Sequence, residues 1–259
     1  MPYIIAALVL SVLLYILHKL RLVHLLLHDV RDRTSRDNAS LFRQMEALHG
    51  LYVELDLKQS LPTTRGWAAS PDFLLELARH ARSARPRIVV ECSSGASTLV
   101  LARCLQLNGA GKVYSLEHDP YFARQTREHL RRLGLEDWAR VVDAPLQPHE
   151  LTGESWPWYD LADLPADQDI DLLVIDGPPQ ATRPLARYPA GPLLFPRLAA
   201  GGHVFLDDAA RPDELAILQR WQREFPALDQ SARTCEKGCS VLIYPSSATT
   251  SSTILVSAA

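Results

Sequence analysis

The sequence predicts an α/β fold in which a doubly wound, mostly parallel sheet follows an apolar N-terminal helix. Three observations support this prediction. Short β-branched runs alternate with helical segments from residue 87 onward. These runs are apolar throughout, as in strands that helices cover on both faces. The first 17 residues contain no charged side chain.

Composition excludes several classes of protein. The chain has 259 residues, of which 47% are hydrophobic and 22% charged, which is typical of a globular protein rather than a disordered or disulfide-rich one. Lys+Arg 27 against Asp+Glu 30 gives a net charge of -3, so a strongly basic nucleic-acid binder is not expected. The four cysteines lack the spacing of a redox or zinc motif.

Residues 3–17 form an apolar stretch that is followed by His18, Lys19 and Arg21. As a helix it measures about 23 Å, short of a bilayer core of about 30 Å, and Lys19 can snorkel to the interface. No basic segment precedes the stretch and no small-residue cleavage site follows it, which favours a single-pass anchor over a signal peptide. The basic residues after the span place the rest of the chain in the cytoplasm. An amphipathic helix that packs on the domain or a partner is the alternative.

The chain divides into four expected parts. These are a membrane anchor and flank (1–28), an amphipathic stalk helix (29–59), a globular domain (60–245) and a disordered Ser/Thr-rich tail (246–259). The stalk is predicted because Leu41, Met45, Leu48 and Tyr52 share one helical face.

The globular domain is expected to contain seven strands joined mainly by helices. Strands are predicted at residues 87–92, 112–116, 140–142, 170–175, 203–206, 230–234 and 239–244. Helices are predicted at residues 72–84, 97–107, 121–133, 185–198 and 212–225. A hairpin-length link separates the last two strands, so one of them must run antiparallel to the rest.

Each of the first five strands ends in a carboxylate. These residues are Glu91, Glu117, Asp143, Asp176 and Asp207, with Asp208 directly after the last of them. The carboxyl ends of parallel strands meet at one edge of the sheet, which is where such sheets bind ligands. Converging carboxylates repel one another unless a polar, cationic or metal ligand is present. The sequence therefore predicts a binding site at this edge.

The turn after the first strand, Cys92-Ser-Ser-Gly95, has a single glycine and is a weak match to a nucleotide-binding loop. Glu117 ends the next strand, where a carboxylate can accept hydrogen bonds from both ribose hydroxyls. The missing further glycines argue against a pyrophosphate on the helix start. A nucleoside cofactor without phosphate is therefore favoured over NAD.

Five segments resemble, in this order, the class I S-adenosylmethionine-dependent methyltransferases: VVECSSGASTLVLA, VYSLEHDP, VVDAPL, DLLVIDGPP and GGHVFLDD. The resemblance covers about residues 60–245 and implies a Rossmann-like, seven-stranded sheet with a C-terminal antiparallel hairpin. It implies S-adenosylmethionine as the cofactor. Ser93 departs from the family pattern, which usually has a glycine there.

The resemblance also implies a set of cofactor-binding residues. Glu91 and Gly95 are expected to flank the methionine part, Glu117 to bind the ribose, and Asp143 with Ala144 to lie beside the adenine. The full expected set is Glu91, Ser93, Gly95, Ser97, Glu117, His118, Asp143, Ala144 and Asp176.

Asp176, Asp207 and Asp208 are similar in position to the residues that bind a divalent cation in catechol-type and macrolide-sugar O-methyltransferases. Their hard oxygen ligands suit Mg²⁺, which can lower the pKa of a substrate hydroxyl. Asp176 and Asp207 are the expected catalytic carboxylates. In the alternative without metal, Asp207 caps a loop, Asp208 is solvated and Asp176 orients the cofactor amine. The base is not assigned; the candidates are His118, His203 and Arg183.

The expected function is methyl transfer from S-adenosylmethionine to an oxygen of a small-molecule, sugar or lipid-linked acceptor. Glycans and lipid-linked sugars are considered because the protein is expected to be anchored in a membrane. The alternatives are an NAD-linked oxidoreductase and a non-catalytic, membrane-tethered binding module. Asp176-Gly-Pro-Pro179 resembles the D-P-P-Y motif of nucleic-acid base methyltransferases, but it lacks the aromatic residue that stacks on a base. No nucleic acid partner is expected.

Overall fold

A computed structural model of the chain describes residues 1–64, 66 and 68–245. Two compact units are distinguished, Met1–Glu46 and Ala47–Ala259. The tail that was expected to be disordered, residues 246–259, lies outside the described residues.

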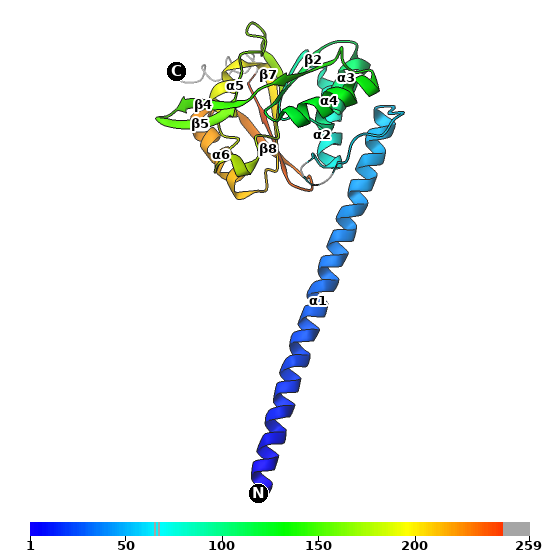
Figure 1. The fold of residues 1–259 in the computed structure, drawn as a ribbon, viewed down its shortest axis with the longest axis vertical. Coiled ribbons are helices and arrows are strands. Elements are labelled where there is room, and N and C mark those ends of the chain that lie inside the picture. Colours follow the sequence, from blue (N-terminus) through cyan, green and yellow to red (C-terminus); the bar gives the residue numbers. More distant parts are fainter. Residues whose placement is uncertain (65, 67, 246–259) are drawn as a thin grey trace, which may run out of the picture. The chain divides into compact units, whose positions relative to one another are not determined.

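The first element, α1, is a single uninterrupted helix over Pro2–Glu54 (Figure 1). It contains an 18-residue window with a mean hydropathy of 2.1, and none of that window is buried. The helix is therefore long and apolar enough to cross a membrane. No break in the helix marks the expected boundary between anchor and stalk.

The end of α1 belongs to the globular unit. Ala47 and Leu51, with Leu55 directly after the helix, lie in the hydrophobic core. Arg103 donates from Nε to the Leu55 carbonyl at 2.9 Å, which ties this end to the domain. The last residues of α1, from Ala47 onward, thus belong to the compact unit that contains the sheet, because this end of the apolar helical face is buried.

Seven strands form one sheet in the order β3-β2-β1-β6-β7-β9-β8. Their bounds are β1 Ile88–Cys92, β2 Lys112–Glu117, β3 Ala139–Asp143, β6 Ile170–Ile175, β7 Leu198–Asp207, β8 Asp229–Arg233 and β9 Cys239–Ile243. The first five of these run parallel, and β9 is antiparallel to both β7 and β8. The predicted mostly parallel sheet with a closing antiparallel hairpin is confirmed.

Helices cover both faces of the sheet (Figure 1). On one face lie α2 (Pro71–Ala84), α3 (Ala96–Asn108) and α4 (Pro120–Leu133), and on the other α5 (Ala190–Leu194) and α6 (Pro212–Glu224). In α2, Phe73, Leu77 and Ala81 recur at helical spacing and are buried, as an amphipathic helix requires. A proline begins α2, α4 and α6, where its missing N–H costs no hydrogen bond.

The segment between β6 and β7 differs from the prediction. The helix expected at residues 185–198 is limited to α5, with short 3₁₀ turns η1 (Gln180–Thr182) before it and η2 (Phe195–Arg197) after it. Pro189, Pro192 and Pro196 explain the difference, because proline lacks the N–H that continues a helix.

A two-stranded hairpin between β3 and β6 was not expected from the sequence. It consists of β4 (Leu146–Leu151) and β5 (Glu154–Tyr159), which pair antiparallel. Pro148 pairs with Pro157 in the middle of this ribbon, and neither strand contains a β-branched run. Strand patterns do not detect such a segment, because proline normally argues against a strand.

Candidate functional site

The parallel strands β1, β2, β3, β6 and β7 have their carboxyl ends at one edge of the sheet. The strand order reverses between β1 and β6, so the segments that follow these two strands diverge. In such sheets the crevice at this switch point is the usual ligand site. The turn after β1 lies on one side of it and Asp176, directly after β6, lies on the other.

Ser93 adopts a backbone conformation that L-residues rarely occupy. Its φ is 120°, and Gly95 follows with a φ of 152°. The Ser93 amide donates to the Leu116 carbonyl at 3.0 Å, which fixes the turn against β2. The chain therefore keeps the backbone path that a glycine would take, at the cost of local strain.

Glu91 supports this turn from inside the core. Its Oε2 accepts hydrogen bonds of 2.6 Å from both Thr98 and Ser115, and Thr98 Oγ1 in turn accepts from the Gly95 amide at 3.0 Å. Burial raises the pKa of Glu91 to about 7, although these hydrogen bonds oppose the shift. Glu91 thus holds the turn in place, and its side chain is fully buried rather than exposed at the edge.

Glu117 is held rigidly at the end of β2. Its Oε2 accepts from Ser94 Oγ at 2.9 Å and its Oε1 from the Asp119 amide at 3.0 Å. His118 Nδ1 lies 3.2 Å from Oε1, and this contact raises the pKa of His118. The carboxylate is therefore fixed beside the turn that contains Ser94.

Asp143 and Ala144 lie next to Glu117. Glu117 pairs with Asp143 across β2 and β3, and the Ala144 amide donates to the Glu117 carbonyl at 2.8 Å. The Asp143 side chain is exposed and pairs with Arg127 at 2.8 Å. Ala144 is buried, and so is Ser97 at the start of α3.

The three aspartates of the expected metal site come together. One carboxylate oxygen from each of Asp176, Asp207 and Asp208 lies within 4.8 Å of the others. Burial is the main reason that the pKa of Asp176 rises to about 6, and the pKa of Asp207 is also well above its usual range.

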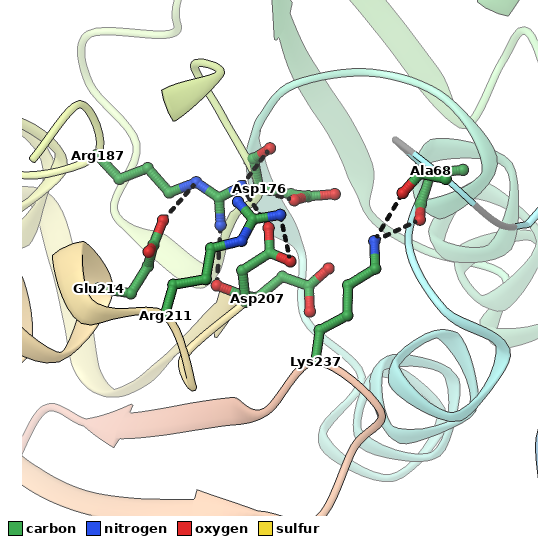
Figure 2. A network of polar contacts seen from close by, with 9 residues as sticks. Ala68, Asp176, Arg187, Asp207, Arg211, Glu214 and Lys237 are labelled. Carbon is green, nitrogen blue, oxygen red and sulfur yellow. Dashed lines mark hydrogen bonds and ion pairs between the residues drawn. The ribbon is translucent and has the colours of Figure 1, made fainter. Parts of the chain in front are cut away.

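Arg187 lies among these carboxylates and was not predicted from the sequence (Figure 2). Its Nη2 lies 3.1 Å from Asp176 Oδ1 and 2.8 Å from Asp208 Oδ2. The same guanidinium donates to the backbone carbonyls of Asp176 at 3.2 Å and Asp207 at 2.8 Å. Its side chain is 4% exposed. Arg187 therefore supplies much of the positive charge that the carboxylates require, and it links the ends of β6 and β7.

Further charged groups surround this cluster (Figure 2). Arg211 pairs with Asp208 Oδ1 at 2.9 Å, and Glu214 Oε1 lies 3.6 Å from Arg187 Nε. Lys237, in the turn between β8 and β9, donates to the carbonyls of Gly66 and Ala68 at 3.1 and 3.0 Å.

Asp207 is the exception in this network. It is completely buried, and neither of its side-chain oxygens has a hydrogen-bond partner among the described residues. A buried carboxylate without a partner is strongly unfavourable. This residue therefore marks the place where a further cation or hydrogen-bond donor would be stabilised.

Two candidates for the base do not lie at this edge. His203 pairs with Leu172 in the body of the sheet and packs on His80 of α2, with ring centroids 4.3 Å apart. Arg183 stacks on Trp156 at 3.5 Å and donates to the Ser155 carbonyl. Only His118 of the three lies next to a strand end of the site.

Comparison with known proteins agrees with this architecture. Residues 90–209 match a family described as a methyltransferase domain. The chain is similar to a methyltransferase of Podospora anserina bound to S-adenosylhomocysteine, with 18% identity, 82% of this chain and 95% of that chain covered, and a TM-score of 0.57.

Two further solved structures share the fold. A methyltransferase from Geobacter sulfurreducens is 16% identical over 81% of this chain and 97% of that one, with a TM-score of 0.52. The O-methyltransferase TomG from Streptomyces achromogenes, solved with S-adenosylmethionine, is 16% identical over 78% and 89%, with a TM-score of 0.50. A search of curated proteins finds no match.

Replacing Ser93 with glycine is expected to stabilise the protein. Glycine accepts the positive φ without strain, so we expect the free energy of unfolding to rise by about 0.5–1 kcal/mol in urea titrations. Ser94→Gly is the matched control and should lower it, because it removes the hydrogen bond to Glu117. A loss of stability in Ser93→Gly would show that the turn is not strained.

Replacing Arg187 with methionine is expected to destabilise the protein by about 3–5 kcal/mol, because it leaves Asp176 and Asp208 buried without their cation. Arg140→Met removes only an exposed contact to Asp163 and should change the free energy of unfolding by less than about 0.5 kcal/mol. Urea unfolding of both variants checks this, and equal stabilities would contradict the role assigned to Arg187.

Proposed function

We propose that this chain, whose residues 90–209 match a methyltransferase domain family, is an S-adenosylmethionine-dependent enzyme that methylates an oxygen of a small-molecule, sugar or lipid-linked acceptor. The observation that carries the proposal is the pairing of two features at one sheet edge. The strained turn at Ser93 follows β1, and the hydrogen-bonded carboxylate of Glu117 ends β2. The buried Asp207, whose side chain has no hydrogen-bond partner among the described residues, ends β7.

The cofactor occupies the side of the switch point nearest β1 and β2 in this proposal. When bound, it supplies a methyl group activated by the sulfonium. Glu117 accepts hydrogen bonds from the ribose, and its fixed geometry favours this because the carboxylate needs no reorganisation. The turn at Ser93 and Gly95 approaches the methionine part, supported from below by Glu91. Ser97 and His118 flank these contacts, and Asp143 and Ala144 lie beside the adenine.

The acceptor lies between the cofactor and Asp207. Asp176 lies next to both the cofactor side and the acceptor side of the site, since it directly follows β6 and belongs to the acidic cluster. The catalytic demand is to bring the acceptor oxygen to within about 3–3.5 Å of the methyl carbon, in line with the bond that breaks. Asp176 and Asp207 can orient a hydroxyl for this approach, since neither side-chain oxygen of Asp207 has a hydrogen-bond partner among the described residues.

Mg²⁺ fits the acidic cluster by the chemistry of its donors. Four buried or half-buried carboxyl groups, those of Asp176, Asp207, Asp208 and Glu214, face two guanidinium groups, those of Arg187 and Arg211. Carboxyl groups thus outnumber guanidinium groups here, and the oxygens of Asp207, which have no hydrogen-bond partner among the described residues, are hard ligands. Asp176 and Asp207 would hold the ion, with Asp208 as the third ligand once an arginine contact is released. When bound, the ion lowers the pKa of an acceptor hydroxyl.

The N-terminal helix anchors the enzyme to a membrane in this proposal. Its apolar window is unburied. The basic residues Lys19, Arg21, Arg31 and Arg33 follow the uncharged residues 1–17. Such a charge distribution favours a single-pass helix of residues 1–28 with the catalytic domain on the cytoplasmic side. An enzyme held at the membrane would meet glycan or lipid-linked acceptors there.

Methyl transfer is tested with the full chain in detergent, methyl-labelled S-adenosylmethionine and a panel that pairs vicinal diols, a catechol among them, with the corresponding amines. We expect a methyl ether on a diol, at least tenfold less product in EDTA, and recovery with Mg²⁺. Asp207→Asn should lower kcat at least a hundredfold, whereas Asp163→Asn, which changes an exposed carboxylate, should not. Methylation of the amines alone would contradict O-methylation. Turnover that persists in EDTA would contradict the need for a divalent cation.

Membrane anchoring is tested by fusing residues 1–28 to a soluble reporter. The fusion is expected to sediment with membranes and to resist extraction at high pH. Leu10→Arg with Leu14→Arg, in the middle of the apolar stretch, should release it, because each charge at the bilayer centre costs about 2.5–3.5 kcal/mol. A soluble wild-type fusion would end the anchor proposal.

A further inference from the structure

Tyr159 is the last residue of β5, in the hairpin that lies outside the seven-stranded sheet. The hairpin leaves the sheet after β3 and returns before β6, so it bridges strands on both sides of the switch point. Its base is closed by the pairing of Leu146 with Tyr159 and by a hydrogen bond from the Asp160 amide to the Pro145 carbonyl at 3.1 Å. Tyr159 is therefore held where the hairpin joins the body of the domain.

The hydroxyl of Tyr159 lies at the crevice between β1 and β6. A β-carbon added to Gly177 would overlap this hydroxyl, and would lie 3.2 Å from the Cys92 carbonyl and 3.3 Å from Ser93 Cβ. The glycine at position 177 thus leaves room for the tyrosine. On the other side, the ring of Tyr159 packs edge-on against His118, with centroids 6.0 Å apart.

Tyr159 thus lies next to two parts of the proposed cofactor site. Its ring contacts the residue after Glu117, which is the proposed ribose ligand. Its hydroxyl is next to the turn at Ser93, which is the proposed contact of the methionine part. No other residue of the hairpin combines these two contacts among the described residues.

None of the side-chain hydrogen bonds within the described part of the chain involves this hydroxyl, and the residue is only 1% exposed. Burial raises the pKa of Tyr159 well above its usual range, so the phenol stays neutral and keeps both its donor and its acceptor capacity. Buried hydroxyls of tyrosine are normally hydrogen-bonded. A bound ligand with polar groups at this point would satisfy it.

We propose that the Tyr159 hydroxyl binds the amino-acid end of the cofactor, accepting a hydrogen bond from its ammonium group beside the Cys92 carbonyl. The hairpin would then complete a cofactor site that the strand ends leave open on this side. The inference rests on the proposed function, because it takes the bound ligand to be S-adenosylmethionine or its product. It adds a binding residue that does not belong to any of the five sequence segments of the expected site.

The test compares two ligands that differ only at the amino-acid end of the molecule. S-adenosylhomocysteine carries the ammonium and carboxylate groups, whereas 5′-methylthioadenosine retains the adenosine and the thioether but lacks both. Calorimetric titration of the full chain gives Kd for each ligand with wild type, Tyr159→Phe and Tyr114→Phe. Tyr114, in the middle of β2, is the matched control, since it loses the same hydroxyl away from the strand ends.

We expect Tyr159→Phe to weaken S-adenosylhomocysteine binding about tenfold or more, as for a hydrogen bond to a charged group. Binding of 5′-methylthioadenosine should change by less than about twofold, which also shows that the variant is folded. Tyr114→Phe should leave both unchanged. An unchanged Kd for S-adenosylhomocysteine, or an equal loss for both ligands, would overturn the inference. Failure of wild type to bind either ligand would instead defeat the proposed function.

Discussion

The buried guanidinium of Arg187 is the interaction on which the acidic edge of this sheet depends. Parallel strands bring their carboxyl ends together, and here β6 and β7 end in Asp176, Asp207 and Asp208. Three buried carboxylates at this separation would repel one another strongly. Arg187 contacts two of them and also the backbone carbonyls of both strand ends. It therefore fixes the geometry in which both side-chain oxygens of Asp207 are left without a hydrogen-bond partner among the described residues.

A second set of buried contacts shapes the other half of the site. Thr98 donates a hydrogen bond to Glu91 and accepts one from the Gly95 amide, so buried groups fix the conformation of the turn after β1. This arrangement explains how serine can stand at position 93 with a φ of 120°. The surrounding hydrogen bonds impose the backbone path, and the side chain at that position adapts to it.

Much of the fold and part of the site could be predicted because they depend on local patterns. Apolar runs and helical spacing identified the seven strands, and the sheet topology then placed Glu117 and Asp176 at one edge without further information. Arg187 and the β4–β5 hairpin could not be found in this way. Arg187 lies in a proline-rich segment whose path is set by packing, although a single arginine between apolar residues is a usable signal in retrospect. The hairpin pairs proline with proline, and proline argues against a strand, although Trp156, Trp158 and Tyr159 favour one.

Methyl transfer by this chain requires that the switch point between β1 and β6 binds the methyl donor. Calorimetric titration of the intact chain in detergent with S-adenosylhomocysteine tests this requirement most directly. One binding site per chain is the result that the account predicts. Absence of binding to protein that still shows a cooperative thermal unfolding transition would contradict it.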